Sequence, residues 1–310
     1  MDNPQFPRFK PIELEDRAFL RDVIWRYQPE TSELTFTNLF LWRMHYGIRW
    51  SVFKDWVLMI AVAPGGETTA FPPLGPSPRL EPVRAILDWL EEGGHGCEPL
   101  IERADARLVA ELGPGGEFAA IPDRDQFDYV YPTSELIALA GSRYHGKRNH
   151  IARFAEAHDF AYAPFEEAHV IPCLNLAEAW CTVKRCDEDM DLMDEWDAAR
   201  ECLAGFRRLE IRGGVILVEG KVEAFTFGEL LNETTAVVHF EKANPDIPGL
   251  YGVINQEFCR AEWSAVPFIN REQDLGEPGL RKAKLSYHPA RFVEKFTLRR
   301  AAGGAAPTRS

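Results

Sequence analysis

The chain has 310 residues, 45% of them hydrophobic, so it can bury a substantial core and has the length of two domains of ordinary size. Its 35 basic against 48 acidic side chains give a net charge of −13, which argues against a protein that coats nucleic acid non-specifically. No apolar run approaches the ~20 residues that cross a bilayer, and the first residues lack the pattern of a secretion signal. We therefore expect a cytoplasmic protein without a transmembrane segment.

Residues 1–140 predict a first domain of helices and strands. Hydrophobic periodicity predicts helices over 16–27, 33–46, 82–92 and 104–112, and short apolar runs between turn residues predict strands over 9–12, 50–53, 56–63, 69–71, 97–102 and 118–121. The many aromatic side chains of this half indicate core packing rather than a ligand site. Few polar groups suited to catalysis cluster here.

Residues 141–300 predict a second domain with the same order of elements. Helices are expected over 142–158, 174–184, 192–208, 250–263 and 278–287, and strands over 160–165, 235–240, 267–270, 292–298 and a hairpin at 213–228. In both halves, helices come first, then a meander of three strands, and then a helix, a strand, a helix and a strand. This repeated order predicts a duplicated α/β (α+β) fold. The small residues of 301–310 predict a disordered tail.

Polar side chains follow the apolar runs of the last third, where an α/β sheet presents groups to a ligand. Glu241, Glu272 and Asp274 are candidate bases or amine-binding carboxylates, expected to converge in one pocket. Candidate substrate-binding residues are Lys242, Asn244, Tyr251, Asn255, Asn270 and Arg271. The alternative interpretation is a buried salt-bridge network. His239 lies inside a predicted strand and is interpreted as a core histidine.

Two basic stretches stand out from the acidic background. Residues 141–153 carry four basic side chains and no acid, and residues 281–300 carry seven against one glutamate. Local positive charge on an acidic protein predicts a phosphate-bearing ligand such as tRNA, although a solvated basic face would give the same pattern. The candidate phosphate- or tRNA-binding residues are Arg143, Lys147, Arg148, Arg153, Arg281, Lys282 and Lys284. Helical spacing predicts that Arg143, Lys147 and Arg153 share one face.

Common nucleotide and hydrolase motifs are missing: the sequence has no Gly-x-Gly-x-x-Gly after a strand, no Gly-x-x-x-x-Gly-Lys and no Gly-x-Ser-x-Gly. Nor does it show zinc-ligand spacing, so no metal is expected. Ala283 is followed by Tyr287 and then Phe292, which resembles the end of the GNAT N-acyltransferases. That resemblance implies that Tyr287 is a general acid for the leaving group.

A wider resemblance is carried by five motifs in order, over residues 144–151, 224–229, 239–244, 254–258 and 269–276. Together they resemble the bacterial phosphatidylglycerol lysyltransferase C-terminal-domain family. The resemblance implies two tandem GNAT-like domains and similarity to the Fem transferases, which take an amino acid from aminoacyl-tRNA. It therefore implies an acyltransferase with aminoacyl-tRNA or acyl-CoA as co-substrate, no permanently bound cofactor, and a small-molecule or lipid-headgroup acceptor.

Two alternatives to aminoacyl transfer remain open at this stage. One is an acyl-CoA-dependent N-acetyltransferase, which needs a free groove between strands splayed at Phe240 and Phe268. The other is a non-catalytic protein of the same fold that binds tRNA or a metabolite.

Overall fold

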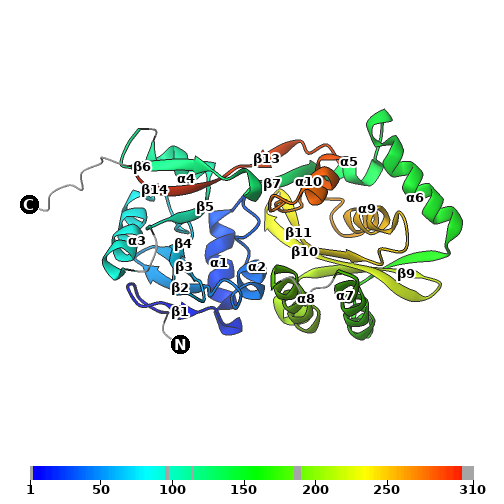
Figure 1. Cartoon of the computed structure of the whole chain (residues 1–310), viewed down its shortest axis with the longest axis horizontal. Coiled ribbons are helices and arrows are strands. Elements are labelled where there is room, and N and C mark those ends of the chain that lie inside the picture. The colour runs from blue at the N-terminus through cyan, green and yellow to red at the C-terminus, as the bar shows by residue number, and fades with distance from the viewer. Residues whose placement is uncertain (1–2, 95–97, 114, 185–189, 302–310) are drawn as a thin grey trace, which may run out of the picture. The chain divides into compact units, whose positions relative to one another are not determined.

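A computed structural model describes residues 3–94, 98–113, 115–184 and 190–301. It contains two seven-stranded sheets, each mixed and mostly antiparallel, with helices packed against them (Figure 1). The predicted α/β class and the predicted pair of mixed, mostly antiparallel sheets are confirmed. Within the described ranges no helix is long and apolar enough to cross a membrane.

The first sheet belongs to a unit formed by residues 1–128, 273–278 and 292–310, called unit 1. Its strands, in sheet order, are β1 (Lys10–Pro11), β2 (Arg49–Phe53), β3 (Trp56–Val62), β4 (Thr68–Ala70), β5 (Ile101–Asp105), β14 (Lys295–Arg300) and β6 (Phe118–Pro122). Its helices are α1 (Arg17–Tyr27), α2 (Phe36–Leu41), α3 (Leu80–Gly93) and α4 (Ala106–Leu112). Val83, Ile86, Leu87 and Leu90 recur at helical spacing, so α3 buries one apolar face in the core.

The second sheet belongs to unit 2, residues 129–272 and 279–291. Its strands, in sheet order, are β13 (Arg291–Val293), β7 (Asp128–Pro132), β12 (Phe268–Asn270), β11 (Thr235–Ala243), β10 (Lys221–Asn232), β9 (Arg212–Val218) and β8 (Phe160–Pro164). Its helices are α5 (Thr133–Ala138), α6 (His145–Ala157), α7 (Val170–Lys184), α8 (Met190–Leu209), α9 (Leu250–Glu262) and α10 (Pro278–Leu285). Helix α9 packs on one face of the sheet, and α7 and α8 lie on the other (Figure 1).

Each sheet takes the strand next to one of its edges from the other half of the chain. Strand β14 lies between β5 and β6, and β7 lies between β12 and β13. The units therefore divide between Asp128 and Tyr129, and the last strand returns to unit 1, which differs from the predicted boundary after residue 140. Of the predicted tail, only Ala301 lies within the described residues.

A few elements differ from the sequence-based expectations. The helix expected over 33–46 is limited to α2, whose N-cap Thr35 accepts a hydrogen bond from the Asn38 amide. The strand expected over 97–102 is displaced to β5, and its expected first residue lies outside the described ranges. Strand β7 and helix α5 were not predicted.

Strands β11 and β12 run parallel for three residue pairs and then separate. Their pairing ends with Val237 and Asn270, whereas β11 continues beside β10 to Ala243. The pairing of β11 with β10 shifts at His239, because Gly228 pairs with Val238 while the preceding residue pairs with Phe240. Such a β-bulge leaves one residue unpaired and redirects the side chains that follow it.

Candidate functional site

An ion pair crosses the place where β11 and β12 separate. Arg271, directly after β12, donates from Nη2 to Glu241 Oε1 of β11 at 2.9 Å. Asn255 of α9 donates to the other oxygen of Glu241 at 3.2 Å. The two charged side chains are only 15% and 12% exposed, so the pair is largely shielded from water. We call Lys147, Glu241, Asn255, Arg271 and Tyr287 the Tyr287 site.

Tyr287 lies just beyond α10, and two cationic side chains lie over its ring. Lys147 Nζ is 3.9 Å from the ring centroid, and the Arg271 guanidinium carbon is 5.0 Å from it. Tyr131 packs edge-on at 6.4 Å, and the Tyr144 hydroxyl donates to the Tyr287 carbonyl at 2.8 Å. Burial raises the pKa of Tyr287, which the charge of Arg271 opposes, so the phenol stays protonated at neutral pH.

Lys147 projects from α6 toward this ring. Burial lowers the pKa of Lys147 to about 8, and the charge of Arg271 adds to that effect. Lys147 recurs with Ile151 and Phe154 at helical spacing, and these two pack into the hydrophobic core of unit 2. The expectation that Lys147 and Arg153 share one basic face is therefore wrong, because Lys147 lies on the inward side of α6 and Arg153 is exposed.

The guanidinium of Arg271 is only partly paired. Burial disfavours its charge, but Glu241 and neighbouring groups outweigh this and raise the pKa of Arg271. Its Nη1 atom is buried and has no hydrogen-bond partner of acceptable geometry among the described residues. The guanidinium, which also interacts with the Tyr287 side chain, therefore holds one unused donor beneath the surface of the Tyr287 site.

Glu272 lies in a different cluster from Glu241. His239 contacts Glu272 through Nδ1 at 2.9 Å and Glu229 through Nε2 at 3.0 Å. A side chain at Gly228 would meet Phe258 of α9, so the next residue, Glu229, points to the opposite face of the sheet. The expected convergence of Glu241 and Glu272 is corrected here: the bulge at His239 leaves them on opposite faces.

Burial disfavours protonation of His239, but its hydrogen bonds to the two carboxylates raise its pKa to about 9. His239 is therefore a buried, paired cation at neutral pH, and it was interpreted as a core histidine from the sequence.

Lys242 and Tyr251 lie near each other, and the charge of Glu241 also acts on Tyr251. Lys242 Nζ pairs with Glu195 of α8 at 2.8 Å and lies 3.5 Å above the Trp180 ring of α7. Trp180 donates to the Tyr251 hydroxyl at 3.2 Å. This group combines one aromatic ring from α7 with charged and polar side chains from three other elements.

The remaining polar candidates have structural partners. Asn244 donates to Glu223 at 2.7 Å, and the buried Asn270 accepts from the Glu272 amide at 2.7 Å. Asp274 belongs to unit 1, where it is buried and pairs with Arg124 at 3.4 Å. Asp274 and Glu241 therefore belong to different units, and their common pocket stays a prediction.

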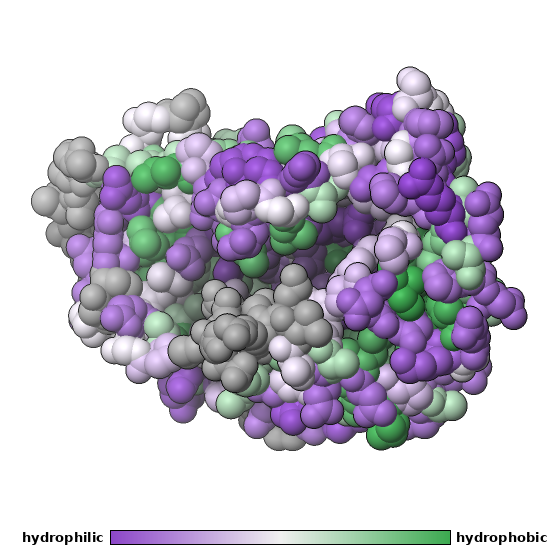
Figure 2. Space-filling view, turned by 45° about the vertical axis from the view of Figure 1, so that its right-hand side comes forward, coloured by the Kyte–Doolittle hydropathy of each residue, from purple (hydrophilic) through white to green (hydrophobic). Residues whose placement is uncertain are grey.

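The seven cations predicted to bind phosphate do not form one exposed basic surface, because most of them have partners within the protein. Arg143 pairs with Glu135 at 2.5 Å, Arg148 donates to the carbonyls of Leu139 and Gly141, and the buried Lys284 donates to the Arg271 carbonyl. Arg281 is half-buried and also has a partner. Arg153 and Lys282 are exposed, with no ion pair in the described part of the chain. Figure 2 shows mostly hydrophilic side chains over the exposed side of α6.

Several contacts of these sites could not be identified from the sequence. Glu195 and Trp180 carry no pattern that links them to the last third of the chain, and the motif over 224–229 does not mark Glu229 as a partner of His239. Lys147 had one usable signal: Phe154, an apolar residue seven positions later, marks the same helix face as inward.

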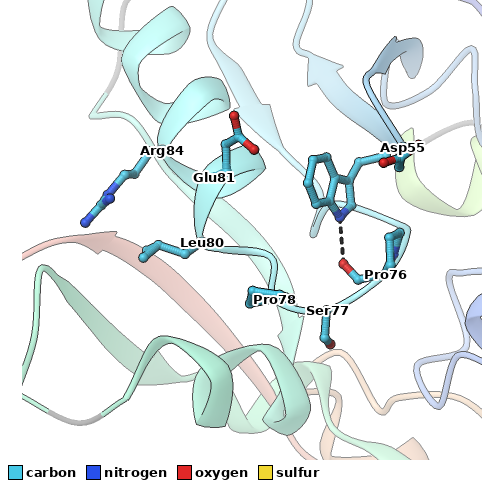
Figure 3. A pocket seen from close by; sticks show the side chains of 8 residues that line it. Asp55, Pro76, Ser77, Pro78, Leu80, Glu81 and Arg84 are labelled. Atoms are coloured by element: carbon cyan, nitrogen blue, oxygen red, sulfur yellow. Dashed lines mark hydrogen bonds between the residues drawn. The ribbon is translucent and has the colours of Figure 1, made fainter.

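A separate cleft of about 580 Å³ lies on unit 1, lined by Asp55, Trp56, Pro76, Ser77, Pro78, Leu80, Glu81 and Arg84 (Figure 3). Its polar groups are used internally: Trp56 donates to the Pro76 carbonyl at 2.7 Å, Glu81 pairs with Lys54, and Arg84 pairs with Glu117. This cleft therefore presents little free polar chemistry to a ligand.

Comparison with known proteins agrees with the resemblance seen in the sequence. Residues 25–299 match the family described as phosphatidylglycerol lysyltransferase, C-terminal. The chain belongs to this family. No curated protein matches the sequence.

Several solved structures of similar fold align with nearly the whole of this chain. A conserved protein of unknown function from Bacteroides thetaiotaomicron is 33% identical, with TM-score 0.88, covering 94% of this chain and 99% of its own. The L-PGS structure from Bacillus licheniformis is 11% identical, with TM-score 0.65 and coverage of 97% and 94%. FemX is 9% identical, with TM-score 0.56 and coverage of 94% and 96%. The last two show a shared fold, and family and fold together support an acyltransferase-type function.

Proposed function

We propose that this protein transfers an aminoacyl group from an aminoacyl-tRNA to an amine or hydroxyl acceptor, with the Tyr287 site as the reaction centre. The observation that carries the proposal is the protonated Tyr287 phenol with the cations Lys147 and Arg271 close to its ring. The family, named for a lysyltransferase, supports aminoacyl transfer as the type of reaction.

The chemistry needs a proton donor for the departing oxygen. The acceptor nitrogen or oxygen attacks the ester carbonyl, a new bond to that carbon forms, and the bond to the ribose oxygen breaks. Tyr287 gives its proton to the ribose oxygen and regains one from solvent, while the acceptor loses a proton to solvent. Arg271 and Lys147 stabilise the transient negative charge on the phenol.

Glu241 has a positioning role in this proposal. Both of its oxygens are engaged, one by Arg271 and the other by Asn255. A carboxylate held in this way orients the guanidinium next to Tyr287 and is poorly placed to act as the base predicted from the sequence.

An acyl-CoA donor is less well supported than an aminoacyl-tRNA. It would need a free groove between β11 and β12, and the Glu241–Arg271 ion pair crosses the place where these strands separate. The exposed cations Arg153 and Lys282 remain available to tRNA phosphates. Phosphate contacts of this kind weaken as salt is added, so donor binding should be salt-dependent.

A donor panel tests the proposal. The protein is incubated with tRNA charged by a mixture of labelled amino acids, or with labelled acetyl-CoA, in the presence of a small-molecule and lipid extract. We expect label to leave the tRNA and appear in a tRNA-free product, and this transfer should be lost in Tyr287→Phe. Transfer from acetyl-CoA alone contradicts the proposed donor, and binding of tRNA without any transfer supports the non-catalytic alternative.

A further inference from the structure

The charged groups that act on Tyr287 do not balance. Two cations, Lys147 and Arg271, face its ring, and one carboxylate, Glu241, is available to them. Glu241 is already paired with Arg271, and Lys147 makes no ion pair within the described residues. The Tyr287 site therefore carries one uncompensated positive charge in a largely buried setting.

A buried charge without a partner is unfavourable, and a negatively charged ligand relieves this more than a neutral one. Burial lowers the pKa of Lys147, and the charge of Arg271 lowers it further, which is one expression of this imbalance. The unpaired Nη1 of Arg271 is a second, because a buried charged donor gains most from a charged acceptor. A cationic group, in contrast, would be repelled by both side chains.

We propose that a substrate of the Tyr287 site carries a carboxylate, which binds between Arg271 Nη1 and Lys147 Nζ beside the Tyr287 ring. This inference rests on the proposed function, because it names the chemical class of a substrate of that acyl transfer. The carboxylate belongs either to an acidic aminoacyl side chain on the donor or to an amino acid or peptide acceptor.

A terminal carboxylate fits this position better than an internal phosphodiester. Nη1 is closed off from solvent, so a ligand reaches it only when a neighbouring side chain moves aside, and a small terminal carboxylate needs less room for this than an internal phosphodiester. Lys147 is only half-buried, and its flexible side chain can move from the ring to meet the ligand.

Small amino acid derivatives test the inference by calorimetric titration of the full chain. Isoasparagine and isoglutamine, the α-amides of aspartate and glutamate, represent an acidic donor, and glycylglycine represents a carboxylate-bearing acceptor. Leucinamide and lysinamide provide matched probes without a carboxylate. We expect at least one carboxylate probe to bind more tightly than leucinamide, and lysinamide to bind most weakly.

Lys147→Met should lower the affinity for that carboxylate probe by about 10- to 100-fold, the range for loss of one charge-assisted contact. Lys147→Arg keeps the charge and should largely retain binding. Lys221→Met is the control, because it removes an exposed lysine of the same unit in the β9–β10 hairpin. The melting temperature of Lys147→Met should not fall, since the lysine is desolvated beside Arg271.

In the wild type, affinity for the carboxylate should also decline above pH 8, near the pKa of about 8 of Lys147, and this decline should be absent from Lys147→Met. The charged and titratable groups that face Lys147 are Arg271, Glu241 and Tyr287.

Three binding results overturn the inference: tighter binding of lysinamide than of every carboxylate probe, equal affinity in wild type and Lys147→Met, or no binding of any carboxylate probe. Failure of the proposed function is distinguishable. Carboxylate binding without transfer from any charged tRNA contradicts the proposed reaction and leaves the carboxylate site standing. Transfer of a cationic aminoacyl group to acceptors that lack a carboxylate retains the reaction and removes the carboxylate site.

Discussion

Replacing Tyr287 with phenylalanine removes one hydroxyl and keeps the ring on which the surrounding residues pack. The contacts of the ring with Lys147 at 3.9 Å, Arg271 at 5.0 Å and Tyr131 at 6.4 Å need no hydroxyl. The hydrogen bond from Tyr144 reaches the backbone carbonyl of Tyr287 and is also retained. The variant should therefore lose no more than about 1 kcal/mol of stability, the typical contribution of one hydrogen bond.

Turnover should fall far more than stability. Loss of a general acid lowers the rate by about 10² to 10⁴, so single-turnover transfer from charged tRNA should slow by that factor while the dissociation constant of the donor is nearly unchanged. A urea titration run beside the kinetic assay separates the two effects. Transfer at the wild-type rate, or a rate loss matched by a large loss of stability, refutes the proton-donor role of Tyr287.

Two further predictions concern the charges around the site. Glu241→Gln leaves Arg271 buried without its counter-charge and should destabilise the protein by about 3 kcal/mol in urea unfolding, and an unchanged midpoint would show that the pair is dispensable. His239 has a folded-state pKa of about 9, above the ~6.5 of an unfolded histidine, so its contribution to stability is complete below that lower value and is lost as pH rises through about 9. A His239→Gln variant should lack this part of the pH dependence, and identical pH profiles for the two proteins would contradict the paired state with Glu229 and Glu272.

Local patterns were sufficient for most of the fold. The apolar spacing of α3 and the turn at Gly220 between β9 and β10 depend on residues close in sequence, and both elements were predicted near their observed positions. Strand β7 was missed because its partner, β12, is supplied by residues far along the chain. No local sequence pattern indicates that β7 and β14 each join the sheet of the other half. The boundary between the units could therefore not be predicted from the sequence.

The candidate site was predictable in composition and less so in geometry. Glu241, Asn255, Arg271 and Tyr287 were all singled out, and the structure brings them together. Glu272 was placed with them because it also follows a predicted strand, whereas the bulge at His239 puts Glu241 on the other face of the sheet. No sequence pattern marks that bulge, which depends on the pairing of β11 with β10.

The most direct test of the central claim is a crystal structure of the protein with a non-hydrolysable aminoacyl-tRNA analogue, an aminoacyl group joined by an amide to 3′-amino-3′-deoxyadenosine. The account predicts that the amide nitrogen, which replaces the leaving oxygen, lies about 3 Å from the Tyr287 hydroxyl, within hydrogen-bond reach. An analogue bound on the opposite face of the sheet, beside His239 and Glu272, would contradict the assignment of the reaction to the Tyr287 site.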